Sequence, residues 1–254
     1  MAARVTASAG RRRRGRTAPA RLLVYAGILT LGLLAAATAA ATAAAQLAGS
    51  VGIDSDYRLR GYSLSNDRPA ATAQVTYDDP SGAYAGASAL AELGYGGRFL
   101  GLIANAGYAK RLNERVTLDA GLLRSQIRSA VPYTPGYKYT EVYAGAYVGP
   151  VAARVYYSPD YRTPGLSTIY GEMEAGFEPA PNWRLNGHVG ILTYLNTKGF
   201  HRGGATHQDW RVGVSRQFGS FEIHSALSGG HPYEYQGARV HKKVAATVGA
   251  NFNF

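Results

Sequence analysis

The last stretch of the chain, residues 243–254, alternates between two kinds of side chain without a break. Its odd positions hold small or polar residues. Its even positions are apolar or aromatic: Val244, Ala246, Val248, Ala250, Phe252 and Phe254. A strict period of two predicts a β-strand with one apolar and one polar face, and a strand of this kind that ends on an aromatic residue is typical of a transmembrane β-barrel. From this pattern alone, an edge strand of a soluble β-sandwich is an equal alternative.

The aromatic end of this strand also suggests how the chain is assembled. Closing strands of bacterial outer-membrane barrels commonly end on an aromatic residue. Phe254, with Phe252 on the same face, resembles the signal that the barrel-assembly machinery recognises. We therefore expect the last strand to contact that machinery and outer-membrane lipid to surround the folded barrel.

Residues 1–45 have the organisation of a secretory signal peptide. Seven arginines and no acidic residue precede or open an apolar run that ends at Leu34 and continues into a stretch of Ala and Thr. Ala43–Ala45 fits a cleavage site of small residues, so we expect cleavage near Ala45, export by the general secretory route and a location in the outer membrane of a Gram-negative bacterium. An uncleaved membrane anchor is the alternative, because the apolar run is nearly long enough to span a bilayer.

The leader also accounts for most of the positive charge. Seven of the 27 basic residues leave with it and no acidic residue does, which lowers the net charge from +11 to about +4. The mature chain is only mildly basic, so nucleic acid is not expected as a partner. The chain has no cysteine, which excludes disulfides and an acylated lipoprotein anchor.

From Gln46 onward, about twelve strand-like segments follow one another, an even number that suits a bacterial barrel. We expect them at residues 47–61, 69–79, 82–95, 99–112, 115–128, 137–149, 151–160, 167–179, 182–195, 206–218, 221–229 and 239–254. Short turns such as 79–82 alternate with longer loops such as 129–137. This alternation predicts an all-β fold: a transmembrane antiparallel up-and-down β-barrel of one domain, residues 46–254, with its short turns in the periplasm.

Alternation within the strands divides their residues between a lipid face and a lumen face. We expect the lumen to contain the carboxylates of Asp54, Asp56, Asp119, Glu141, Glu172, Glu174, Glu178, Asp209 and Glu222, and the cations of Arg58, Arg60, Arg154, Arg184, Arg211 and Lys243. Two interpretations stay open. Opposed acidic and basic rows would select polar solutes, whereas ion pairs would brace the wall.

One set of these charges makes a specific prediction. Glu172, Glu174 and Glu178 share one face of one strand and would repel one another unless cations oppose them. Arg154 and Arg184, on the two neighbouring strands, are the expected partners. The segments 82–95 and 99–112 are too rich in Ala and Gly to be divided between the two faces.

The large aromatic residues fit the two membrane interfaces. Trp183 follows a short turn and Trp210 follows a long loop, so we expect one at each interface, although core positions in a sandwich are the alternative. The 19 tyrosines suit the same interfacial girdles. Arg216 falls on the lipid face near a strand end, where its side chain would extend to the interface.

The segment Ser55–Ser65, which reads Ser-Asp-Tyr-Arg-Leu-Arg-Gly-Tyr-Ser-Leu-Ser, and the following Pro69-Ala70 resemble the opening signature of the TorF-type porin family of proteobacteria. Residues 81–86 resemble the start of that family's third strand. Arg58 departs from the signature, because the family often has an apolar residue there. The resemblance covers about 40 residues and implies an outer-membrane barrel with a pore role and no catalytic residues.

Catalysis and metal binding find little support. Four histidines are expected in or beside the long loops: His201, His207, His231 and His241. No carboxylate–histidine spacing accompanies them, so exposed histidines are favoured over a metal site. His188 and His224 fall on the lumen face, with no lipid-facing Ser–His pair, which disfavours a lipid hydrolase. We expect no catalytic residue, no metal and no cofactor.

These observations predict a porin-like channel for passive diffusion of small polar or charged solutes. A barrel of twelve strands lies between those filled by side chains and those that hold an aqueous channel. The first alternative is therefore a plugged, non-conducting barrel whose loops bind a ligand or surface through aromatic residues: Tyr133, Tyr137, Tyr161, Phe200, Tyr233 and Tyr235. The second is an outer-membrane lipid hydrolase. A monomer is expected.

Overall fold

The computed structural model describes residues 46–94, 97–130, 135–196, 206–230 and 244–254. The predicted leader and the predicted lumen residue Lys243 lie outside these ranges. None of the described residues forms a helix that is long and apolar enough to cross a membrane.

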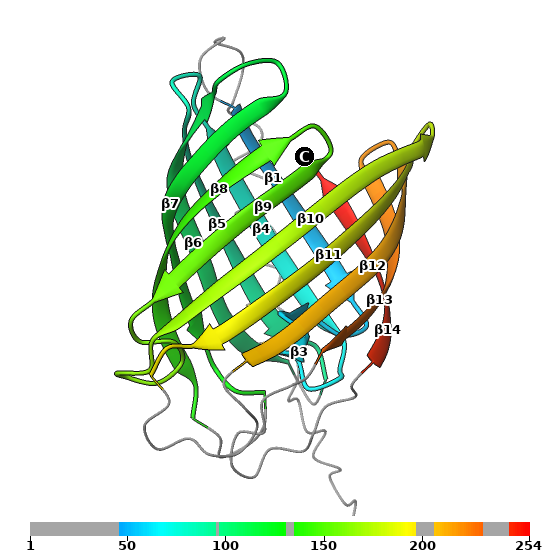
Figure 1. Cartoon of the computed structure of the whole chain (residues 1–254). Coiled ribbons are helices and arrows are strands. Elements are labelled where there is room, and N and C mark those ends of the chain that lie inside the picture. Colours follow the sequence, from blue (N-terminus) through cyan, green and yellow to red (C-terminus); the bar gives the residue numbers. More distant parts are fainter. Residues whose placement is uncertain (1–45, 95–96, 131–134, 197–205, 231–243) are drawn as a thin grey trace, which may run out of the picture.

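The described residues form a closed antiparallel barrel of twelve strands (Figure 1). Its strands are β1 (Gln46–Asp54), β4 (Ala70–Asp78), β5 (Ala83–Glu92), β6 (Arg98–Arg111), β7 (Val116–Ile127), β8 (Tyr137–Val148), β9 (Val151–Ser158), β10 (Thr168–Ala180), β11 (Trp183–Tyr194), β12 (Thr206–Phe218), β13 (Phe221–Gly230) and β14 (Val244–Asn253). Strands that follow one another in the chain pair with one another, and β14 closes against β1. The predicted fold class is confirmed.

The two ends of the barrel differ as the alternation of loop lengths predicts. Connections of two to four residues, such as 79–82 and 149–150, join strands at one end, which also holds the C-terminus and is uppermost in Figure 1. The longer connections lie at the other end. We refer to these as the short-turn end and the long-loop end.

The outer wall of the barrel is apolar. Along β13 and β14, for example, residues alternate between outward positions that are exposed and inward positions that are more buried. Large apolar side chains occupy outward positions around the wall; Val189, Val212 and Val248, for example, are 56%, 61% and 60% exposed. A continuous apolar surface of this kind is stable when lipid surrounds it, so the outer wall is the membrane-spanning surface.

The two tryptophans and Arg216 lie near the membrane interfaces. Trp183 begins β11 at the short-turn end, and Trp210 lies on β12 in the half of the barrel nearer the long loops. The Arg216 guanidinium lies 5.1 Å from the centre of the Trp183 ring and 4.8 Å from that of Phe218. The outward arginine therefore reaches the interface and stacks on its aromatic residues, as the sequence predicts.

The residues of β5 and β6, which are rich in Ala and Gly, could not be assigned to the two faces from the sequence. The pairing of these two strands contains one irregularity. On β5, Leu90 and Glu92 face the lumen and are 4% and 2% exposed. The pairing of β5 with β6 shifts register beyond Leu90, next to Gly101, whose φ is +153°. A Cβ at Gly101 would lie 3.0 Å from the Cα of Ile127 on β7. The bulge therefore depends on a glycine at this position.

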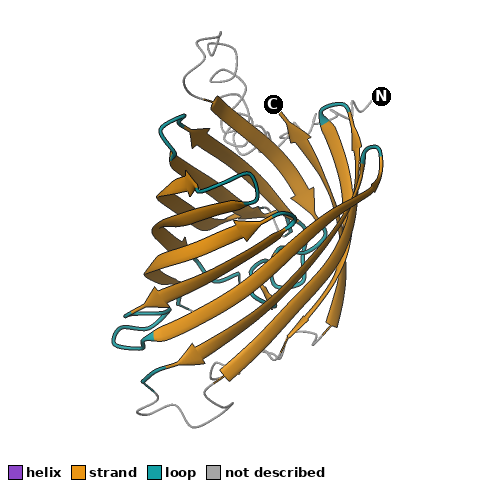
Figure 2. Cartoon of the chain, turned by 45° about the horizontal axis from the view of Figure 1, so that its top comes forward, coloured by secondary structure: helices purple, strands orange, loops and turns teal. Residues whose placement is uncertain are grey.

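The predicted first strand, 47–61, is too long. β1 ends at Asp54, and residues 55–69 turn inward instead of continuing the wall, so that they lie inside the barrel (Figure 2). Within this segment, β2 (Arg58–Leu59) and β3 (Tyr62–Ser63) pair as a small antiparallel hairpin. We call residues 55–69 the inward hairpin. Arg58 and Arg60 therefore belong to this hairpin and not to the wall.

Adjacent residues on β4 provide a test of the two faces. Val75 faces lipid and is 43% exposed, whereas Gln74 faces the lumen. We expect Val75→Arg to lower the free energy of unfolding by about 2–4 kcal/mol, the range for a cation near the bilayer midplane. Gln74→Arg, one residue away, should change it by less than about 1 kcal/mol, because the lumen solvates the charge. Urea unfolding in lipid vesicles measures both, and equal effects would contradict the assignment of faces.

Candidate functional site

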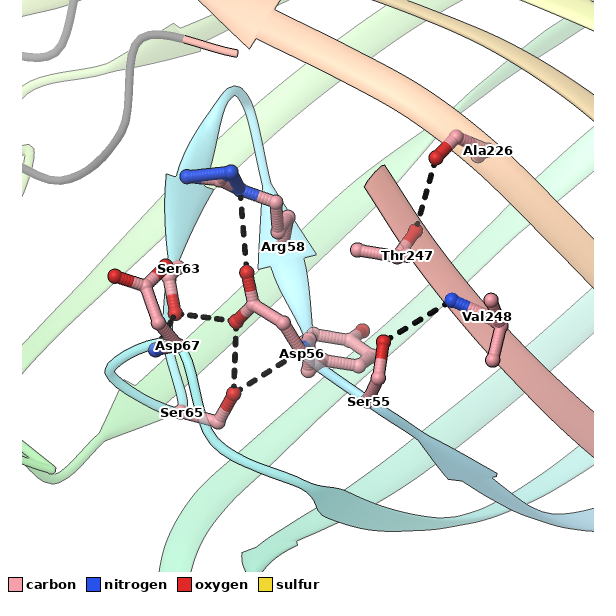
Figure 3. Close-up of polar contacts among 10 residues, drawn as sticks. Ser55, Asp56, Arg58, Ser63, Ser65, Asp67, Ala226, Thr247 and Val248 are labelled. Atoms are coloured by element: carbon pink, nitrogen blue, oxygen red, sulfur yellow. Dashed lines mark hydrogen bonds and ion pairs between the residues drawn. The ribbon is translucent and has the colours of Figure 1, made fainter. Parts of the chain in front are cut away.

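The base of the inward hairpin is held by Asp56, which lies just past the end of β1 (Figure 3). Its carboxylate accepts hydrogen bonds from the hydroxyls of Ser63 and Ser65 and lies 3.5 Å from the Arg58 guanidinium. The backbone N–H of Tyr57 donates to Ser65 Oγ at 3.0 Å. A carboxylate with these three partners holds the two arms of the hairpin together and explains why the chain leaves the wall here.

Before the chain turns inward, it makes a last contact with the closing strand. The N–H of Ser55 donates to the carbonyl of Val248 at 2.8 Å, and Ser55 Oγ accepts from the Val248 N–H at 3.0 Å (Figure 3). The serine side chain replaces the carbonyl that a continuing strand would supply. The seam between β1 and β14 therefore ends where the hairpin begins.

The tip of the hairpin is a two-residue turn, Arg60-Gly61, with φ values of +50° and +77°. Positive φ at both central residues is the type I′ geometry that suits a two-residue hairpin. Glycine adopts it freely, whereas arginine is uncommon there and costs conformational energy. The turn therefore directs the Arg60 side chain across the lumen.

Arg60 forms a two-fold ion pair with Glu141 of β8, on the far side of the lumen. Its two terminal nitrogens donate to the two carboxylate oxygens at 2.9 and 2.8 Å. The two side chains are 9% and 1% exposed. The guanidinium also lies over the Tyr170 ring, 3.9 Å from its centre. These contacts attach the hairpin tip to the opposite wall.

The charge on Arg60 is maintained in this buried setting. Burial by itself lowers the pKa of the guanidinium, but the tyrosine hydroxyls of Tyr161 and Tyr139 and the carboxylate of Glu141 raise it, and the net pKa is well above its ordinary value. Arg162, in the loop after β9, also has a raised pKa: burial opposes the charge, while Tyr137 and Tyr161 favour it. Both arginines therefore act as permanent cations inside the long-loop half of the barrel.

An apolar cluster packs beneath the hairpin on one side of the lumen. Its buried members come from the hairpin, from β4–β7 and from the start of the next loop: Leu64, Ala70, Leu90, Leu100, Ile127 and Ala130. Tyr57 and Leu59 of the hairpin pack against them. This packing fills the sector of the lumen next to β4–β7 at the long-loop end.

Tyrosines fill a second sector, around Arg60. The cluster consists of Tyr139, Tyr143, Tyr156, Tyr161, Tyr170 and Leu192, with Tyr84, Leu123, Tyr137 and Tyr194 packed against it. The Tyr139 and Tyr161 rings are 4.7 Å apart at their centres. Tyrosines were expected at the membrane interfaces, and the sequence pattern did not predict this lumen cluster. The strand alternation could have predicted it, because Tyr139 and Tyr143 lie two residues before and after Glu141 and therefore share its lumen face.

Two residues expected on the loop surface belong to this lumen cluster. Tyr161 is 4% exposed, and Tyr137 begins β8 and packs against the cluster. They are therefore not available for binding at the loop surface. The other four aromatic residues of that alternative, at positions 133, 200, 233 and 235, lie outside the described residues.

The predicted partners of the three glutamates on β10 are wrong. Arg154 lies opposite Glu172 in the strand register, but its guanidinium pairs with Asp119 of β7 at 3.3 Å. Glu172 instead accepts a hydrogen bond from the Tyr156 hydroxyl at 2.7 Å. Among the described residues, neither Glu174 nor Glu178 forms an ion pair with Arg184.

The two lumen histidines take the place that the arginines were expected to fill. His188 lies 2.8 Å from Asp209 and 3.6 Å from Glu174. His224 lies 2.7 Å from Asp54 and 3.8 Å from Glu222. Each imidazole therefore lies close to two carboxylates. Neither donates to or accepts from a serine hydroxyl in the part of the chain that the structure describes.

From the middle of the barrel to the short-turn end, inward charged side chains are exposed. Glu174 is 48% exposed, and Glu178, Arg184 and Arg211 are also exposed. Acidic and basic residues are interleaved on β7–β13 and do not form opposed rows. On β4, β5, β6 and β14, uncharged polar residues lie along the lumen face: Thr72, Gln74, Ser88, Asn105 and Asn251.

The described ranges contain no group of three or more His, Cys, Asp or Glu side chains that could hold a metal ion. His207 is 6% exposed and stacks edge-on against Tyr194, so it is a packed residue of the lumen. The other three histidines expected near loops, at positions 201, 231 and 241, lie outside the described residues.

The terminal aromatic residues close the barrel seam. The Phe254 N–H donates to the Gly49 carbonyl at 2.9 Å, and the Gly49 N–H donates to the Phe254 carbonyl at 2.8 Å. The Phe252 ring lies between those of Phe221 and Phe254, with centres 5.0 and 6.2 Å apart. The aromatic face predicted for the last strand is therefore present at the short-turn end of the outer wall.

Comparison with known proteins identifies a matching family and solved structures with a similar fold. The model of a family described as a bacterial protein of unknown function, Gcw_chp, matches residues 38–244. No curated protein matches significantly. The fold is similar to that of the NanC porin, with a TM-score of 0.54, 10% identity and coverage of 82% of this chain and 99% of that one. It is also similar to the KdgM porin, with a TM-score of 0.50, 9% identity and coverage of 82% and 99%.

Proposed function

We propose, for a chain that belongs to the Gcw_chp family of bacterial proteins of unknown function, a role as an outer-membrane channel for passive diffusion of small polar or charged solutes. The single observation that carries this proposal is the set of inward-pointing charges, from the middle of the barrel to its short-turn end, that remain exposed to water, with Glu174 at 48%. A barrel filled by side chains would bury them. The similarity in fold to porins supports the same function.

The inward hairpin acts in this proposal as the constriction of the channel. The hairpin and the side chains packed around it fill the parts of the lumen next to β4–β7 and β8–β10, so the conducting path does not pass there. The remaining route at the long-loop end passes β13 and β14, whose inward residues there are small and partly exposed: Ala226, Ala245 and Thr247. Thr247 and Ala226 lie on the wall beside the hairpin in Figure 3. Solutes would enter the wider, charged half after passing this point.

The balance of charge suggests a preference for cations. Four lumen arginines are matched by carboxylates, in the pairs Arg58–Asp56, Arg60–Glu141, Arg68–Glu92 and Arg154–Asp119. Six lumen carboxylates have no arginine partner among the described residues: Asp54, Glu172, Glu174, Glu178, Asp209 and Glu222. Arg162, Arg184, Arg211 and the two histidines carry at most five positive charges, against six carboxylates when these are ionised. The residual field is therefore negative.

Single-channel recording tests the proposal. The full chain, expressed and purified from membranes, should give stepwise conductance in a planar bilayer, and a salt gradient should give a reversal potential of the sign for cation preference. Glu174→Gln with Glu178→Gln should lower the cation-to-anion permeability ratio about twofold or more, because lumen charge sets ion concentration in the pore. Arg184→Gln with Arg211→Gln, the matched opposite change, should raise it. A heat-modifiable barrel that never conducts would contradict the channel function.

A plugged barrel that binds a ligand is the second candidate function. The observation in its favour is the packed core under the hairpin, where Leu100 is fully buried and Leu64 is 7% exposed. This function predicts no conductance from the native protein, together with binding that is lost when an outer loop is deleted. The same recordings therefore separate the two functions. We propose no catalytic role, and we propose that the barrel is monomeric and is assembled through its last strand after cleavage of the leader near Ala45.

A further inference from the structure

One region of the outer wall departs from its apolar character. At the long-loop end of β7 and β8, five outward positions are polar, and we call them the rim patch: Arg124, Gln126, Arg128, Lys138 and Thr140. Arg124 lies directly opposite Thr140 in the strand register, and Gln126 lies opposite Lys138. Three cations and two hydrogen-bonding side chains therefore share one area of the surface.

The patch faces outward and not into the lumen. The residues between its members on β7 point inward and are buried: Ser125 is fully buried and Ile127 is 3% exposed. The Arg124 guanidinium donates to the Thr140 hydroxyl at 2.7 Å, in an exposed setting. The Arg128 guanidinium lies 5.7 Å from the centre of the ring of Phe99, an outward residue that is 39% exposed. All three cations are exposed.

Carboxylates do not balance these cations on the same surface. β7 and β8 each contain one acidic residue, Asp119 and Glu141. Both face the lumen and are paired there with Arg154 and Arg60. The rim patch is therefore a net positive surface with donors and no carboxylate of its own strands to neutralise it.

The patch lies where the apolar belt ends. Leu122 and Val142, the next outward residues toward the middle of the barrel, are 55% and 49% exposed and belong to the lipid-facing surface. An arginine on a lipid-facing strand costs about 2–4 kcal/mol at the midplane and close to zero at the interface. Arg124 and its neighbours therefore lie at the level of the lipid headgroups, on the side of the long loops, which is the external side in barrels of this type.

We propose that the rim patch binds the phosphate-bearing headgroup of a lipid in the outer leaflet. Arginine presents planar, paired donors that match a phosphate, and the lysine and the two polar side chains add further donors. From Arg124 to Arg128 the patch extends about 14 Å along the strand, at about 3.4 Å per residue, which suits one headgroup. The acyl chains of the same lipid would lie along the apolar belt below it. A free anion would bind the rim patch without contacting the apolar belt below it.

Lipid binding by the full chain, purified from membranes in detergent, tests this inference. The probes are lipid A with two phosphates, the same lipid without phosphates, and inorganic phosphate, and native mass spectrometry measures what is bound. Wild type should retain phosphorylated lipid A in preference to the other two. Arg124→Gln, Arg128→Gln and Lys138→Gln together should weaken its binding about tenfold or more, because three charge-assisted contacts are lost.

The matched control removes outward cations from the opposite interface. Lys110→Gln with Arg216→Gln changes residues at the short-turn end and should leave lipid A binding unchanged. Where the triple variant does not fold, Arg124→Gln and Lys138→Gln are measured singly. Equal binding of lipid A by the patch variants and wild type would overturn the inference. So would equal binding of dephosphorylated lipid, or displacement of lipid A by inorganic phosphate at low millimolar concentration.

Discussion

Replacing Glu141 with glutamine should release the inward hairpin from the far wall and enlarge the conducting path. The change leaves the Arg60 charge buried without its carboxylate partner, and both side chains are at most 9% exposed in the native protein. Breaking one partner of a buried ion pair costs about 3–5 kcal/mol. A hairpin held by one such pair at its tip responds by local opening before the barrel itself unfolds.

The measurement combines conductance with unfolding. Glu141→Gln and Arg60→Met should each raise single-channel conductance and increase protease cleavage within residues 55–69. The double variant Arg60→Met with Glu141→Leu removes both charges, so its free energy of unfolding should return to within about 1–2 kcal/mol of wild type. Its conductance then shows whether packing alone keeps the hairpin in place. Unchanged conductance and protection in both single variants would contradict the role of Arg60 as an anchor.

Removal of Phe254 should strongly reduce the yield of folded barrel. The seam between β1 and β14 has five register pairs, from Ser50–Asn253 to Asp54–Gly249, compared with nine on the other side of β1. Phe254 adds two backbone hydrogen bonds to this short seam, each worth about 1 kcal/mol. It also supplies the terminal ring that we expect the assembly machinery to recognise. Loss of both effects acts on the last step of barrel closure.

Three variants separate these contributions. Deletion of Phe254 removes the bonds and the ring, Phe254→Ala removes the ring alone, and Phe218→Ala removes an outward aromatic from β12 that is 47% exposed and lies away from the seam. The heat-modifiable fraction in membranes measures folding. We expect a large loss for the deletion, an intermediate loss for Phe254→Ala and little change for Phe218→Ala. A normal yield from the deletion would contradict both the seam and the recognition roles.

The wall of the barrel could be predicted in detail because its determinants are local. A period of two assigned Val212 and Val248 to lipid and Asp119 and Asp209 to the lumen, and the structure places them there. Strand limits agreed within a few residues for most strands. Where alternation is weak, as in β5 and β6, the shift in pairing beyond Leu90 could not be predicted, since Ala and Gly give no contrast between faces.

The contents of the lumen were only partly predictable. The alternation along the strands placed Glu141, Arg154 and Glu172 inside the barrel, but the predicted ion-pair partners were wrong. Arg154 pairs with Asp119, and the carboxylates of Glu174 and Asp209 lie beside His188. The alternation predicts which side of the wall a residue faces, but it does not predict which inward side chains contact one another. Those contacts depend on side-chain length and on the curvature of the closed wall.

The sequence by itself determined a closed antiparallel barrel with an apolar outer wall and a charged interior, because strand alternation and turn chemistry are properties of neighbouring residues. Only the tertiary structure decided what occupies that interior. The Ser-Asp-Tyr-Arg-Leu-Arg-Gly segment continues the alternation of β1, yet it leaves the wall, because Asp56 binds Ser63 and Ser65 and because Arg60 meets Glu141 across the lumen. The second of these contacts joins residues 81 positions apart. It exists only once the barrel has closed, so no local pattern encodes it.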